Sequence, residues 1–77
     1  MRVEVNGSVK RPGLFELKEG ERWRDLITFC YGFSDDAYRK SFRIKTSTDS
    51  ERRIETLLAS ETDTFVFRSG DILEVDA

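Results

Sequence analysis

The chain has no histidine and a single cysteine, Cys30, and both scarcities restrict the chemistry it can perform. Most zinc sites draw on several cysteine and histidine ligands, and Cys-His or Ser-His nucleophile pairs need an imidazole. One cysteine cannot form a disulfide within the chain, so cysteine usage does not indicate a redox compartment. We therefore expect no cofactor, no metal site and no catalytic residues, and hence a protein that is not an enzyme.

Long hydrophobic runs are also missing. No apolar stretch approaches the roughly 20 residues that a bilayer-spanning helix requires. The first five residues lack the apolar stretch of a signal peptide. A chain of 77 residues is long enough for one domain with a thin core. We expect a single domain, residues 1–77, that is part of a longer protein and does not itself span a membrane.

The charge is nearly balanced overall but unevenly distributed. The net charge is −2 and the isoelectric point is about 5.1, which argues against nucleic acid as a partner. Residues 39–53 carry six basic and two acidic side chains, whereas residues 54–77 carry six acidic and one basic. These two segments either pair across neighbouring strands or form a bipolar surface for a partner. Pairing is the simpler interpretation.

The first third of the chain predicts a β-hairpin. Val3 and Val5 alternate with charged residues, and Phe15 and Leu17 flank Glu16, which is the period-2 pattern of half-buried strands. Between them, residues 6–13 contain Asn-Gly-Ser and Arg-Pro-Gly, both typical of turns. The hairpin loop is therefore longer than two residues.

A short amphipathic helix is predicted next. Four apolar residues have the spacing of one helical face: Trp23, Leu26, Ile27 and Cys30. Arg22 occupies the expected N-cap, where a short polar residue is usual, and Asp25 in the first turn partly compensates. Gly32 is well placed to end the helix in a left-handed conformation.

The second half of the chain predicts further strands. Apolar and polar side chains alternate over residues 42–46, which predicts a third strand. Residues 48–60 fit either a strand or a helix, and we favour a short strand that runs into one helical turn. Residues 65–67 and 72–75 flank a turn and complete the chain. This order predicts an α+β fold in which a mixed sheet wraps around a single helix.

Three motifs together resemble the soluble-ligand-binding β-grasp family. Residues 5–17 (VNGSVKRPGLFEL) resemble its opening pattern V-x-G-x-V-x-x-P-G-x-aromatic-x-L, and residues 70–75 (GDILEV) resemble its closing strand. Between them, the match continues from Gly20 through the helix to Ala37. Tyr31 stands where the family usually has the first glycine of a pair. The resemblance implies a β-grasp fold for the whole chain.

The resemblance also implies a function. Such domains are most numerous in outer-membrane polysaccharide export proteins, where they are periplasmic and occur in ring-shaped homo-oligomers. The implied role is a non-catalytic binding or assembly module that contacts an acidic polysaccharide or neighbouring subunits, while the isolated domain is a monomer. Alternatives are a domain of a quinone-linked electron-transfer subunit, or a ubiquitin-like sulfur carrier. The chain ends in Glu-Val-Asp-Ala rather than the Gly-Gly that a carrier requires.

Candidate contact residues come from the basic segment and the end of the helix. They are Arg39, Lys40, Arg43, Lys45 and Tyr31. Trp23 could also stack on a sugar, but its place on the apolar helix face favours the core, as does that of Cys30. We expect Asp71 to accept backbone hydrogen bonds in its turn. The pair Asp35-Asp36 is expected in a turn and lacks further metal-ligand residues.

Overall fold

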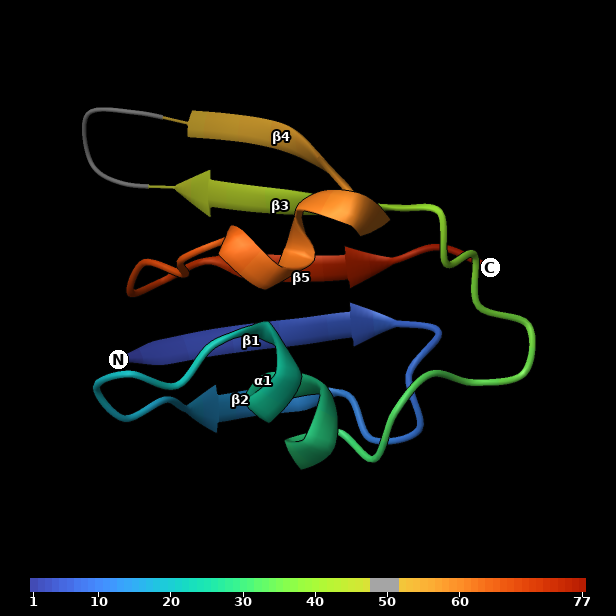
Figure 1. Cartoon of the computed structure of the whole chain (residues 1–77), viewed down its shortest axis with the longest axis horizontal. Helices are drawn as coiled ribbons and strands as arrows, with labels where there is room; N and C mark the ends of the chain where they lie inside the picture. Colours follow the sequence, from blue (N-terminus) through green and yellow to red (C-terminus); the bar gives the residue numbers. More distant parts are fainter. Residues whose placement is uncertain (48–51) are drawn as a thin grey trace.

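Over residues 1–47 and 52–77, which the computed structural model describes, the chain forms a five-stranded mixed sheet, one α-helix and one 3-10 helix (Figure 1). The elements are β1 (Arg2–Gly7), β2 (Gly13–Glu16), α1 (Trp23–Phe29), β3 (Ser41–Ser47), β4 (Arg52–Leu58), η1 (Ala59–Thr64) and β5 (Ile72–Val75). Both helices lie in front of the sheet in Figure 1, α1 over β1 and β2, and η1 over β5.

The first and last strands are neighbours in the middle of the sheet. The strand order is β2-β1-β5-β3-β4, with β1 parallel to β5 and the other pairs antiparallel. In this register Leu73 of β5 lies between Val5 of β1 and Ile44 of β3, so apolar residues from three strands share one face. The predicted α+β class is confirmed.

Helix α1 begins and ends close to its predicted positions. Arg22 is the N-cap, and the Asp25 carboxylate accepts a hydrogen bond from the Arg22 backbone N–H at 2.9 Å. This bond is the half of a capping box in which the third helical residue accepts from the N-cap backbone N–H. Within the described part of the chain, no helix is long and apolar enough to cross a membrane.

The end of α1 adopts a left-handed conformation one residue earlier than predicted. Tyr31 (φ 63°) and Gly32 (φ 86°) both have positive φ. The N–H of Gly32 donates to the carbonyl of Ile27 at 2.9 Å, and that of Tyr31 donates to Thr28 at 3.1 Å. This pair of bonds is the Schellman motif, whose first left-handed position is usually glycine. Here Tyr31 occupies that position.

The ambiguous segment 48–60 contains a strand that runs into a helical turn, as we favoured from the sequence. Strand β4 runs directly into η1, and the Glu61 carboxylate accepts a hydrogen bond from the Leu58 backbone N–H at the start of η1. Residues 48–51 of that prediction lie outside the described residues. Strand β4 forms one edge of the sheet, and of its side chains only Leu57 is buried.

The core lies between the sheet and the two helices. The buried apolar residues are Val3, Val5, Val9, Leu17, Trp23, Leu26, Cys30, Phe42, Ile44, Leu57, Phe67, Leu73 and Val75. The Trp23 ring lies 4.7 Å from Phe42 and 6.2 Å from Phe67, centroid to centroid. Trp23, Leu26 and Cys30 are buried as predicted, whereas Ile27 is only partly buried at the margin of the core.

Candidate functional site

Two of the predicted contact residues lie on the open face of the sheet, opposite the helices. Arg43 and Lys45 alternate along β3 with the buried Phe42 and Ile44. The Arg43 guanidinium lies 2.7 Å from the Asp76 carboxylate and 3.1 Å from that of Glu74. The Lys45 ammonium lies 3.0 Å from Glu74. Both cations are therefore paired with acidic residues on and just after β5.

These ion pairs limit the ability of Arg43 and Lys45 to bind an acidic ligand. The hydrogen bond and charge of Asp76 raise the pKa of the Arg43 guanidinium above its ordinary value. For these two residues, the structure supports the interpretation that the basic and acidic segments pair across neighbouring strands. A ligand that bound there would have to compete with carboxylates already in place.

The other two basic residues precede β3 and lie elsewhere. The Arg39 guanidinium lies 5.5 Å from the centroid of the Phe33 ring, and Arg39 lines a hollow of about 180 Å³ with Trp23 and Phe42, on the helix side of the sheet. The Lys40 carbonyl accepts a hydrogen bond from Ala59, and its side chain is exposed. The four basic residues do not form one cluster, because Arg39 and Arg43 lie on opposite faces of the sheet.

The fifth predicted residue, Tyr31, lies at the end of α1. Its side chain is 64% exposed. The Arg11 guanidinium carbon lies 5.6 Å from the Tyr31 ring centroid, and an Arg11 nitrogen lies 3.4 Å from the Tyr31 hydroxyl. Arg11 was not among the predicted contact residues. No local sequence signal indicates it, because its position beside Tyr31 depends on hydrogen bonds between its loop and the turn after α1.

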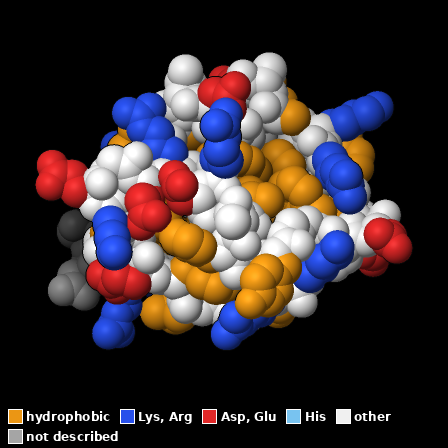
Figure 2. All heavy atoms as spheres, turned by 60° about the horizontal axis from the view of Figure 1, so that its bottom comes forward, with side chains coloured by type: hydrophobic (Ala, Val, Ile, Leu, Met, Phe, Trp, Pro, Cys, Tyr) orange, Lys and Arg blue, Asp and Glu red, His pale blue; other side chains and the backbone are white. Residues whose placement is uncertain are grey.

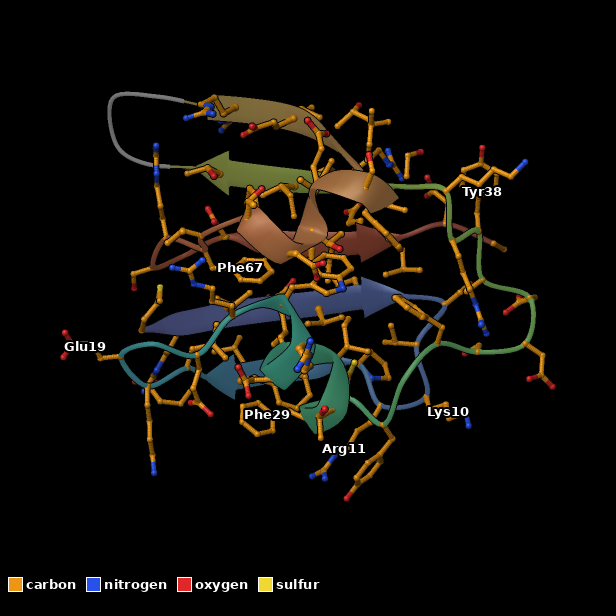
Figure 3. All side chains as sticks on the ribbon, viewed as in Figure 1. Lys10, Arg11, Glu19, Phe29, Tyr38 and Phe67 are labelled. Atoms are coloured by element: carbon orange, nitrogen blue, oxygen red, sulfur yellow. The ribbon has the colours of Figure 1, made fainter. Side chains whose placement is uncertain are left out.

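A hollow of about 550 Å³ adjoins this pair of side chains between β2 and the end of α1. It is lined by Arg11, Leu14, Phe15, Glu16, Thr28, Phe29 and Tyr31. In Figure 3, Arg11 and Phe29 lie just below α1. Figure 2, turned to bring that side forward, shows hydrophobic side chains reaching the surface among Lys and Arg side chains. This surface combines apolar and cationic groups.

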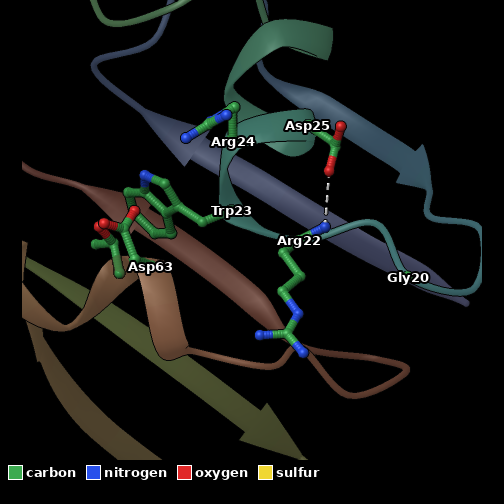
Figure 4. Close-up of a pocket in the computed structure, with 7 residues that line it drawn as sticks. Gly20, Arg22, Trp23, Arg24, Asp25 and Asp63 are labelled. Carbon is green, nitrogen blue, oxygen red and sulfur yellow. Dashed lines mark hydrogen bonds between the residues drawn. The ribbon is translucent and has the colours of Figure 1, made fainter.

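A second hollow, of about 490 Å³, lies between the start of α1 and η1 (Figure 4). Trp23, Arg22, Arg24 and Asp63 contribute to its lining. Trp23 is only 9% exposed, so it presents little of its ring to this hollow and belongs mainly to the core. The sequence interpretation that favoured a core role for Trp23 agrees with this position.

Other polar groups that the sequence singled out have structural partners. The buried Asp71 carboxylate accepts hydrogen bonds from the Thr46 hydroxyl at 2.6 Å and the Arg68 backbone N–H at 2.8 Å. The expected turn role of Asp71 is confirmed. Burial raises the pKa of the Cys30 thiol, which keeps it protonated. In residues 1–47 and 52–77 no cluster of three or more Cys, His, Asp or Glu side chains could hold a metal ion.

The structure is that of a small α+β domain with a mixed five-stranded sheet and open hollows beside α1. Residues 2–51, more than half of the chain, match the SLBB domain family, the soluble-ligand-binding β-grasp domains found in polysaccharide export proteins. The chain therefore belongs to the SLBB family, as the sequence motifs indicated. Comparisons with curated proteins and with solved structures returned no match.

Proposed function

We propose that this domain is a non-catalytic binding and assembly module of a periplasmic, outer-membrane-associated polysaccharide export protein. The observation that carries the proposal is the SLBB match over residues 2–51, because this family is a ligand-binding family that occurs in such proteins. In this proposal, residues 1–77 are one domain of a longer, homo-oligomeric parent protein. Its partners are an acidic polysaccharide or neighbouring subunits.

A β-grasp fold is part of the proposal, and the topology supports it. The first and last strands are parallel neighbours at the centre of a mixed sheet, each extended outward by antiparallel strands. Helix α1 follows the first hairpin and covers one face of that sheet. This arrangement leaves the opposite face and both edge strands accessible to partners.

The contacts in this proposal lie at separate places on the surface. Arg39, Lys40 and Tyr31 have exposed side chains that could meet a glycan or a neighbouring subunit. Arg43 and Lys45 are paired with Glu74 and Asp76, so they fit a contact with another subunit that exchanges ion pairs. Contacts between such exposed charges weaken as salt rises.

The test is made in the full-length protein in its native host. We expect Leu26→Asp, which places a charge in the core at a fully buried position, to unfold this domain and reduce extracellular polysaccharide. The matched control is Glu19→Gln at an exposed loop position, which should leave export unchanged. Fractionation should place the parent protein in the periplasm or outer membrane.

Two outcomes would contradict this function. Normal polysaccharide export with the domain unfolded would exclude an export role. A loss of quinone-linked respiration with normal export would instead support the electron-transfer alternative.

A further inference from the structure

We propose that the hollow between β2 and the end of α1 binds one residue of an acidic glycan, with Arg11 binding the sugar carboxylate and Tyr31 packing against the sugar ring. This inference rests on the proposed function and assigns its ligand contact to a definite surface. It moves that contact away from the basic segment 39–45, which the sequence favoured.

The first argument is charge. In the described residues, no carboxylate lies within ion-pair distance of Arg11, whereas Arg43 contacts two carboxylates. Guanidinium groups bind carboxylates through two parallel hydrogen bonds, which a point charge cannot do. Arg11 is therefore a cation whose strongest interaction is still available to a ligand.

The second argument is the combination of shape and apolar surface. Ligand sites typically have volumes of about 300–1,000 Å³ and are lined by aromatic and aliphatic side chains with a few polar groups. The hollow measures about 550 Å³ and places Phe15, Phe29 and Leu14 beside the Arg11–Tyr31 pair. Leu14 is 58% exposed, so apolar surface is available to a ligand.

The polar lining also suits a sugar. The Glu16 carboxylate lies 3.7 Å from the Arg2 guanidinium, so part of its charge is compensated by a neighbouring group. Carboxylate oxygens accept hydrogen bonds from hydroxyl groups, which a sugar supplies in number. The Thr28 hydroxyl donates to the Arg24 carbonyl and retains its capacity to accept.

The third argument is that Arg11 and Tyr31 are held by rigid backbone. The Arg11 N–H donates to the Cys30 carbonyl at 2.9 Å, and the Lys10 N–H donates to the Gly32 carbonyl at 3.0 Å. The loop after β1 is thereby joined to the turn after α1. Side chains that project from a fixed backbone lose less freedom when a ligand binds.

The fourth argument is the backbone strain at Tyr31. A left-handed φ is unfavourable for any residue with a side chain, and the ring of Tyr31 is too exposed to recover that cost by burial. Strained positions of this kind are found preferentially at functional sites. The exposed, strained tyrosine and the adjacent arginine thus point to the same surface.

The experiment is a chemical-shift titration of the domain at low salt with trigalacturonic acid, and separately with its methyl ester, which lacks the negative charge. We expect shifts at residues 11, 14 and 28–31 with the acid, and weak or no shifts with the ester. Arg11→Gln should weaken binding about tenfold or more, through loss of a charged hydrogen-bond pair. Tyr31→Gly, which also suits the left-handed backbone, should weaken it about fivefold.

The matched controls are Arg52→Gln and Arg68→Gln, which each remove one exposed positive charge away from the hollow and should leave the affinity nearly unchanged. Shifts centred on residues 39–45, or equal loss of affinity in these controls, would overturn the proposed site and leave glycan binding itself intact. Equal binding of acid and ester would overturn the role of Arg11. A lack of shifts at millimolar acid would overturn the inference, while the polysaccharide measurement would decide the export function separately.

Discussion

At the scale of single residues, the backbone conformation explains several sequence choices. Gly7 has φ 96°, and a Cβ atom added to it would lie 2.1 Å from the carbonyl oxygen of Val75. That carbonyl accepts a hydrogen bond from Ser8 next to the β1–β5 pairing, so it cannot easily move. Only glycine lets the end of β1 approach β5 this closely.

Gly7→Ala should therefore destabilise the domain by about 2–4 kcal/mol, from steric overlap added to left-handed strain. The control is Gly20→Ala, because Gly20 also has a positive φ (86°), but a Cβ atom added to it would meet no atom beyond its chain neighbours within 4 Å. This change should cost only about 1 kcal/mol. Urea denaturation followed by tryptophan fluorescence measures both, and equal effects would show that contact with β5 is unimportant.

Tyr31 allows the backbone strain to be measured apart from the side chain. Tyr31→Ala and Tyr31→Gly both remove the ring and its contact with Arg11, but only glycine relieves the left-handed strain. The glycine variant should be more stable than the alanine variant by about 1 kcal/mol. A more stable alanine variant in thermal denaturation would mean that this turn is not left-handed in solution.

At the scale of the elements, α1 is short and depends on packing. A helix of seven residues has little stability of its own, so its apolar face must be held by the sheet. The sequence treated Leu26 and Ile27 as equivalent members of that face. The structure buries Leu26 completely and leaves Ile27 at the margin of the core.

Leu26→Ala should cost about 2–5 kcal/mol, whereas Ile27→Ala should cost distinctly less, since a partly exposed side chain leaves a smaller cavity. The total stability expected for a domain of this size is about 4–12 kcal/mol, so the first change alone would remove a large fraction of it. Denaturation midpoints of the two variants make the comparison. The reverse order of stability would contradict this placement of α1 on the sheet.

At the scale of the whole molecule, the ion pairs and the hollows lie on different parts of the surface. The open face of the sheet carries the ion pairs that join β3 to Glu74 and Asp76, while the two larger hollows described above adjoin α1. Exposed ion pairs contribute little to stability, typically about 0–1 kcal/mol each. Exposed charges affect the choice of binding partner more than they affect the stability of the fold.

We expect the isolated domain to be monomeric at micromolar concentration. Stable association usually needs about 1,200–2,000 Å² of buried surface in total, and in the proposed parent protein other domains would supply part of that interface. Sedimentation equilibrium measures this directly. A tight dimer or ring formed by these residues alone would show that this domain drives assembly of the parent protein.

Features that depend on local periodicity could be predicted from the sequence alone. The alternation at Val3 and Val5 and the helical spacing of Trp23, Leu26 and Cys30 each place side chains on one face of a single element. Turn chemistry likewise indicated the role of Asp71, whose carboxylate binds a backbone N–H three residues away. Such features need no knowledge of distant residues, and they were predicted correctly, together with the α+β class and the SLBB family.

Which distant residues meet depends instead on tertiary packing. Arg43 pairs with Asp76 across 33 positions, and Arg11 meets Tyr31 across 20, and no local pattern encodes either approach. These contacts depend on the order of the strands in the sheet and on how the chain turns between them. For the same reason, the basic segment 39–45 is continuous in the sequence, but its side chains lie on both faces of the folded sheet. The same long-range packing leaves Ile27 at the margin, because the sheet covers only part of the helical stripe that the spacing defines.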